Sequence, residues 1–253
     1  MVELLRPLLA RTGFLKGCTI GSLIVAFAGS LLGSAAAFAQ GADVHYFHQG
    51  IMPPGAIGGV RLARGGPVHG HFQPVEIRAP RGVRIATASG GQFDESAPAP
   101  LRLGLHVGAV YRLRATHVPF AEGEEVFPTI EVIDRTYAPL DQQQRFAIPV
   151  ELTEEDLRLA LEGKFVTRVI YLEDPTRALP APEDPQGQHW FEVRPGDDPL
   201  AVADTLGRPV AILRLGGRLP DDAVGIDDAF LYGSPPLVRY AAEVTVLPPP
   251  PRR

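Results

Sequence analysis

Short apolar or alternating runs, separated by glycine and proline, recur along most of this chain and constrain its fold more than any other feature. Glycine contributes 27 and proline 26 of the 253 residues, enough to break the chain between successive runs. Runs of this kind predict a mainly β protein, built as an antiparallel β-sandwich (Ig-like) or a partly open barrel with two short helices. The runs lie at residues 72–77, 83–87, 101–118, 129–134, 145–152, 165–172, 210–215 and 238–247.

Two of these runs indicate where their strands lie in a sheet. In 145–152, every second residue from Phe146 to Leu152 is apolar, so we expect these residues to share one face of a strand. Pro149 has no backbone N–H to donate, which predicts that this strand lies at a sheet edge. The run 166–172 is apolar on both faces apart from one arginine, which predicts a central strand.

Two segments carry helix signals. The segment 153–162 begins with Thr153, a good N-cap, followed by three acidic residues where the helix dipole favours negative charge. Gly163 supplies the expected C-terminal stop. A second, shorter helix is predicted at 199–206, with Gly207 after it.

The first 39 residues have the pattern of a secretory signal. Residues 1–16 contain three basic side chains, and residues 17–39 carry no charge and end in Ala-Phe-Ala. Signal peptidase recognises such a pattern, so we expect cleavage before Gln40. An uncleaved anchor is the alternative, because about 20 apolar residues span a bilayer. The sequence therefore predicts export to the periplasm, the cell envelope or the medium, with membrane contact only through a retained leader.

The rest of the chain divides by composition into three parts. Residues 40–66 are rich in glycine and proline without any period, and we expect a flexible entry segment there. Residues 67–247 contain the strand runs and the two helix signals, and we expect them to form one β-rich domain. Residues 248–253 are four prolines and two arginines, which predict an extended tail.

Charge and cysteine content exclude several chemistries. The formal net charge is −5 and the sequence has no basic stripe, so it offers no electrostatic basis for binding nucleic acid. The single cysteine, Cys18, lies in the predicted leader. The mature chain therefore cannot form disulfides, hold a metal through thiolates or use a thiol nucleophile.

Histidines supply the candidate metal ligands. His45 and His48 lie near the predicted mature N-terminus, and His69 and His71 flank one glycine. On a strand, His69 and His71 would point to the same face, a spacing compatible with ligation. Four neutral imidazoles would suit zinc or copper. No carboxylate lies at a diagnostic spacing, and surface histidines would give the same pattern.

Catalytic signatures are missing from the predicted mature chain. Its serines are Ser89, Ser96 and Ser234, and none lies in the Gly-x-Ser-x-Gly sequence that exposes a nucleophile. A glycosidase would need two opposed carboxylates, and no pair of acids is singled out. The sequence therefore favours a protein without enzymatic activity and identifies no catalytic residue.

Several segments resemble exported proteins of planctomycetes. The segments are FQPV at 72–75, GAVYRL at 108–113, PTIEVIDR at 128–135, FVTRVIYLEDP at 165–175 and RPVAILRLGGR at 208–218. The similarity extends over most of residues 70–218. It implies export and a folded body, and it implies no activity.

A shorter segment, 193–207, resembles the opening of LysM modules, which bind peptidoglycan or chitin. It pairs a Gly-Asp turn with a short helix that carries an apolar-Ala step. The asparagine of the usual continuation is absent, because the chain contains no asparagine, and 209–215 has the pattern of a strand instead.

Together these features predict an exported, non-enzymatic β-sandwich protein of the cell envelope with a structural or binding role. Its partner would be an unidentified protein or an envelope polymer, and no cofactor is expected. Two alternatives stay open. One is an exported zinc- or copper-binding protein that uses the four histidines. The other is a protein that binds or acts on an envelope polysaccharide.

Overall fold

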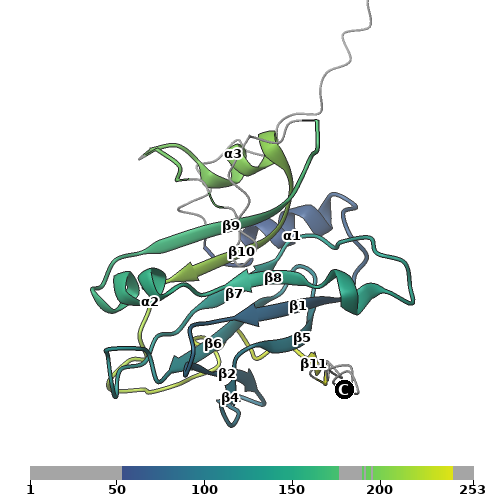
Figure 1. Cartoon of the computed structure of the whole chain (residues 1–253). Helices are drawn as coiled ribbons and strands as arrows, with labels where there is room; N and C mark the ends of the chain where they lie inside the picture. Colours follow the sequence, from purple (N-terminus) through teal and green to yellow (C-terminus); the bar gives the residue numbers. More distant parts are fainter. Residues whose placement is uncertain (1–52, 177–189, 191, 195, 242–253) are drawn as a thin grey trace, which may run out of the picture. The chain divides into compact units, whose positions relative to one another are not determined.

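The computed structural model describes residues 53–176, 190, 192–194 and 196–241 (Figure 1). The predicted leader and tail, as well as His45 and His48, lie outside these residues. In chain order the elements are α1 (Ala56–Ala63), β1 (Phe72–Arg78), β2 (Arg84–Ser89), β3 (Gln92–Phe93), β4 (Ala97–Pro98), β5 (Leu101–His106), β6 (Val110–Thr116), β7 (Thr129–Val132), the 3₁₀-helix η2 (Gln143–Phe146), β8 (Ile148–Glu151), α2 (Glu154–Leu161), β9 (Val166–Glu173), α3 (Pro199–Leu206), β10 (Gly207–Leu215) and β11 (Leu237–Arg239).

The strands form two sheets with the apolar core between them. The smaller sheet has the order β11-β5-β1-β8, and the larger has the order β3-β2-β6-β7-β10-β9 with β4 paired to β2. Neighbouring strands run antiparallel, except that β1 and β8 are parallel. The core joins residues of the smaller sheet, such as Val75 and Leu103, to residues of the larger, such as Leu113 and Leu213. The mainly β, open sandwich prediction is confirmed, and the sheets do not close into a barrel.

Alternation places apolar residues of the smaller sheet inward. Val75 and Ile77 of β1 are fully buried, whereas Glu76 between them faces outward toward Arg102 of β5. β8 lies at the edge of this sheet, so the prediction made from Pro149 is confirmed.

Phe146 departs from the predicted alternation. It ends the 3₁₀-helix η2 before β8 begins, and about half of its surface is exposed. The chain therefore does not extend as a strand until Ile148.

The predicted central position of 166–172 is wrong. β9 is the edge strand of the larger sheet, and its residues are half-buried on both faces. Its apolar side chains pack against α3 and the flank of the sandwich, which explains a pattern that resembles a central strand. The strand buried on both faces is its neighbour β10, in which positions 209–215 are all buried.

The prediction that 40–66 is flexible is wrong for its described part, because α1 forms there. Ile57 is buried with Ile212 of β10 in a small apolar cluster. The backbone N–H of Gly58 donates to the buried Glu131 carboxylate, with a nitrogen–oxygen distance of 2.8 Å. These tertiary contacts hold a helix that has no side-chain N-cap.

Helices lie at both positions where the sequence predicts them. Thr153 caps α2 in a capping box with Asp156, and Asp156 also pairs with Arg168 of β9. α3 begins at Pro199 with Asp198 as its N-cap. Each described α-helix has eight residues, and none of them could cross a membrane.

Candidate functional site

The two predicted metal ligands that the structure describes do not lie on a strand. His69 and Gly70 form a turn, and His71 precedes β1. In residues 53–176, 190, 192–194 and 196–241, no three His, Cys, Asp or Glu side chains gather around a common point. Because His45 and His48 fall outside these residues, a four-histidine metal site stays a prediction from the sequence.

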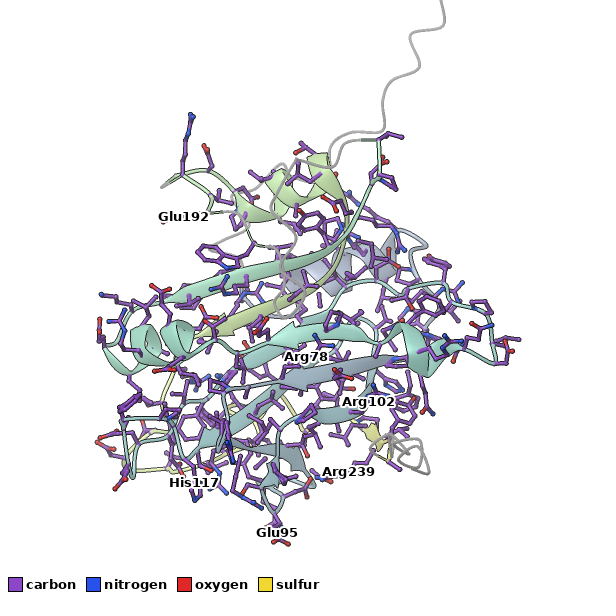
Figure 2. All side chains as sticks on the ribbon, in the orientation of Figure 1. Arg78, Glu95, Arg102, His117, Glu192 and Arg239 are labelled. Atoms are coloured by element: carbon purple, nitrogen blue, oxygen red, sulfur yellow. The ribbon has the colours of Figure 1, made fainter. Side chains whose placement is uncertain are left out.

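Two of the three serines meet in a hollow at one end of the sandwich. Ser96 bonds Arg84 and takes no part. Ser89 and Ser234 both line an open cavity of about 580 Å³, which we call the hairpin hollow. Its other lining residues are Asp94, Glu95, 235–237 and Arg239. Figure 2 labels Glu95 and Arg239 in the same lower part of the molecule.

A tight hairpin forms one wall of the hairpin hollow. β2 and β3 pair with Ser89 opposite Gln92, so only Gly90 and Gly91 form the turn. Both glycines have positive φ, 59° and 82°, which a two-residue turn of this kind requires. The turn exposes Ser89 at the end of β2 and leads the chain into Asp94 and Glu95.

The segment between Phe230 and Pro236 forms the opposite wall, and buried groups fix both of its ends. Arg112 Nε donates to the Phe230 carbonyl at 3.2 Å, and its guanidinium lies 4.5 Å from the centre of the Phe230 ring. The Tyr111 hydroxyl donates to the Pro236 carbonyl at 2.8 Å. Burial raises the pKa of Tyr111 to about 12, so this donor keeps its proton at neutral pH.

Backbone strain is concentrated between these two anchors. Tyr232, Gly233 and Ser234 all have positive φ, 53°, 72° and 45°. The left-handed region is unfavourable for tyrosine and serine, and such residues persist where the surroundings hold them. Gly91 N–H donates to Ser234 Oγ at 3.3 Å, which joins the strained segment to the hairpin turn.

An ion pair with a shared hydroxyl closes the floor of the hollow. Arg239 Nη2 lies 2.8 Å from both Asp94 Oδ2 and Thr87 Oγ1, and the Thr87 hydroxyl donates to the same carboxylate oxygen. Glu95 is exposed beside this network, and the described residues offer its carboxylate no ion pair. The hollow therefore presents hydroxyls, one paired and one unpaired carboxylate, and a guanidinium.

The polar groups of the hairpin hollow can donate and accept hydrogen bonds. They lie beside the apolar residues 235–237, which line the rest of the cavity. The cavity volume falls in the range of roughly 300–1,000 Å³ that is usual for small-molecule sites. Such a lining suits a neutral ligand with many hydroxyl groups, because carboxylates accept from hydroxyls while serine and arginine can donate to them.

The sequence alone does not identify Asp94, Glu95 or Arg239 as site residues. A signal for the hairpin was present, since Gly90-Gly91 between two β-prone stretches is a typical turn sequence. No local pattern joins Asp94 to Arg239, because 145 residues separate them along the chain. Only the pairing of β11 with β5 brings Arg239 to this end of the sandwich.

No protein-family model, curated protein or solved structure matches the chain.

Proposed function

We propose that the protein is exported and acts in the cell envelope as a non-enzymatic binding protein. In this proposal the hairpin hollow binds a saccharide unit of an envelope polymer. The observation that carries it is the lining of the hollow, where Ser89, Ser234, the Asp94–Arg239 pair and Glu95 surround one cavity. Sugar hydroxyls would donate to the carboxylates and accept from the arginine.

Rigidity of the hollow supports a binding role. Its two walls are the β2–β3 hairpin and a segment held by Arg112 and Tyr111. Asp94 and Arg239 are held in place by their mutual bond and by Thr87. A ligand would meet groups that are already oriented, which lowers the entropy cost of binding.

Export rests on the predicted leader and needs its own test. The protein would be expressed in a bacterial host with an active secretion pathway and recovered from the periplasm or medium. An N-terminal sequence beginning at Gln40 is the expected result. Recovery only from the cytoplasm, with Met1 or Val2 at the N-terminus, would contradict the export part of the proposal.

The binding part is tested by thermal unfolding of the purified protein with soluble envelope oligosaccharides. A ligand at 100 times its Kd stabilises a protein by about 2.7 kcal/mol, which is a rise in Tm of roughly 5–10 °C for a chain of this size. Zinc and copper would be measured in parallel. A shift produced by metal and by no saccharide would favour the histidine hypothesis.

Variants locate the binding. Arg239→Gln and Ser89→Ala should each reduce the saccharide shift, since they remove a donor from the hollow. Arg81→Gln is the matched control, because Arg81 is exposed in the turn before β2 and lines neither cavity described for this protein. A saccharide shift that survives both hollow variants would place the ligand elsewhere.

A further inference from the structure

A second cavity lies at the start of β1, and no residue of the hairpin hollow lines it. This cavity, of about 130 Å³, is formed by the start of β1, the segment after β7 and η2. We call it the Arg135 recess. The residues that matter for its chemistry are His71, Gln73, Arg135, Tyr137, Leu140 and Gln143. Among the residues that the structure describes, no carboxylate lines it.

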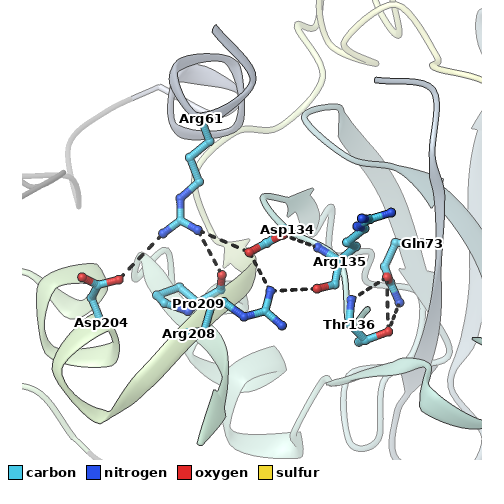
Figure 3. Close-up of polar contacts among 8 residues, drawn as sticks. All are labelled: Arg61, Gln73, Asp134, Arg135, Thr136, Asp204, Arg208 and Pro209. Carbon is cyan, nitrogen blue, oxygen red and sulfur yellow. Dashed lines mark hydrogen bonds and ion pairs between the residues drawn. The ribbon is translucent and has the colours of Figure 1, made fainter. Parts of the chain in front are cut away.

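The acid nearest to Arg135 in sequence is engaged by other groups. Asp134 Oδ2 lies 2.6 Å from Arg208 Nη1 and 3.9 Å from Arg61 Nη1. Asp134 Oδ1 accepts from the backbone N–H of Arg135. Figure 3 shows the Arg135 side chain directed away from Asp134, while Arg61 and Arg208 converge on that carboxylate. Arg135 therefore contributes a positive charge that this acid does not offset.

The Arg135 guanidinium has no carboxylate partner among the described residues. Its carbon atom lies 4.2 Å from the centre of the Tyr137 ring, a cation–π contact that fixes its position. Its Nε is buried without a hydrogen-bond partner in the described structure. A fixed guanidinium that lines a cavity matches a planar carboxylate, which such a group can bind through two parallel hydrogen bonds.

The backbone around this arginine is held in an uncommon conformation. Tyr137 has a φ of 56°, which costs free energy for a residue with a bulky side chain. Gln73, which is buried, accepts from the Thr136 N–H at 2.9 Å and keeps the strand-to-loop junction in place. The recess is thus a built feature of the fold, because a buried side chain of β1 supports it.

The other residues that line the recess indicate what kind of molecule the bound carboxylate belongs to. Partial burial and the charge of Arg135 lower the pKa of His71, so its imidazole is neutral at pH 7 and can form a hydrogen bond. Gln143 adds an amide that can pair with a peptide group. Leu140 is 90% exposed at the rim and Tyr137 is more than half exposed, so both can contact an aliphatic group.

We propose that the Arg135 recess binds the free C-terminal carboxylate of a peptide that ends in a small aliphatic residue. The Arg135 terminal nitrogens would hold the carboxylate, Gln143 would bond the last peptide group, and Leu140 would contact the aliphatic side chain. The volume of the recess admits one such residue. The site is independent of the saccharide site proposed above.

Calorimetric titration of the full chain with N-acetyl-Ala-Ala tests the proposal, with N-acetyl-Ala-Ala-amide as the matched ligand. The acid should bind at least tenfold more tightly than the amide, because the amide lacks the charge that Arg135 recognises. Galacturonate and galactose form a second pair. Binding of galacturonate as tight as that of the peptide acid would overturn the assignment to a peptide.

Four variants complete the test. Arg135→Gln should weaken binding of the acid at least tenfold, and Gln143→Glu should weaken it by placing a like charge beside the ligand. Arg145→Gln removes an equal charge from an exposed position in η2 outside the recess and should leave the affinity unchanged. Equal affinity in wild type, Arg135→Gln and Gln143→Glu would refute the recess as the site. Arg239→Gln should bind the peptide acid as wild type does, because Arg239 does not line the recess. The peptide-binding and saccharide-binding proposals can therefore fail independently.

Discussion

Each of the two sheets carries a charged cluster on its outer face. On the larger sheet this cluster is buried beneath helix α1. On the smaller sheet, Glu76 bonds Arg78 and Arg102 at 2.7 Å, and half of the Arg78 side chain is exposed to solvent. Figure 2 labels both arginines. On the larger sheet, Glu131 and Arg214 pair at 2.8 Å, and both are at least 96% buried. The carboxylate–arginine pairs of the two sheets should therefore contribute differently to stability. Water screens the Glu76–Arg78 pair, whereas it is excluded from the Glu131–Arg214 pair.

Helix α1 lies over the buried pair. Glu131 Oε1 accepts from the Gly58 N–H, while its Oε2 bonds Arg214. A carboxylate near a helix N-terminus is favourable, and this one also balances a buried guanidinium. The pair thus ties β7, β10 and α1 together, whereas the bonds of Glu76 join β1 to β5.

The largest expected effect comes from breaking the buried pair. Glu131→Ala leaves the Arg214 charge uncompensated and the Gly58 N–H without its acceptor, which should cost about 3–5 kcal/mol. Tm should fall by roughly 6–20 °C, as measured by thermal unfolding. The double variant Glu131→Met/Arg214→Met should recover only the part that is due to the unpaired guanidinium, because the Gly58 N–H still lacks its acceptor. A loss below 1 kcal/mol in the single variant would show that the interior is hydrated there.

The second prediction concerns two adjacent glycines of α1, at which substitution by alanine should change the stability of the protein in opposite directions. A Cβ at Gly58 would lie 2.8 Å from the Gly108 Cα, a backbone atom, whereas a Cβ at Gly59 would meet nothing within 4 Å. Gly59→Ala should stabilise the protein by roughly 0.5–1 kcal/mol, because alanine favours a helix interior. Gly58→Ala should destabilise it, since the helix must move off the sheet.

Urea unfolding of the two glycine variants checks this prediction. If both substitutions stabilise the protein, α1 does not pack against the β5–β6 turn. If neither has any effect, the helix is not formed in solution, as the glycine- and proline-rich sequence of 40–66 predicts.

The error over α1 and the success over the strands have one physical explanation. Strand positions follow from alternation, which each run displays locally, as Ile148 and Val150 do in β8. Helix α1 contains two glycines and lacks a side-chain N-cap, so its local signals oppose a helix. Its stability comes from Ile57 and from a hydrogen bond to Glu131, a residue 73 positions away. A single sequence does not reveal contacts of that separation.

The two candidate sites also depend on contacts between residues that are far apart in the sequence. Ser89 and Ser234 are visible in the sequence as serines, but nothing local predicts that they share a cavity. Arg135 is visible as a basic residue, yet its missing partner depends on Asp134 being bound by Arg61 and Arg208. Local periodicity therefore predicts fold class, whereas both sites depend on pairings between distant segments.

The smallest expected effect is on the Glu76 cluster, and it depends on pH. Partial burial alone would raise the pKa of Glu76, but the hydrogen bonds and charges of Arg78 and Arg102 outweigh it, and the net pKa lies below the usual value. A carboxyl whose pKa is lowered on folding stabilises the protein above its unfolded pKa, about 4.3, and this contribution is lost as pH falls through the folded value.

Glu76→Gln should therefore cost less than Glu131→Ala at pH 7, because Arg78 is half exposed and water screens its pair with Glu76. The difference from wild type should shrink as the pH is lowered from 5 to 3. Urea unfolding across that range measures it, with Glu122→Gln as the control, because Glu122 is exposed in a loop. The control should show no such convergence. A Glu76→Gln loss as large as that of Glu131→Ala would mean that the outer face of the smaller sheet is also covered in solution. The contrast between the two sheets would then be wrong, and a segment or partner that shields Glu76 from water would have to be sought.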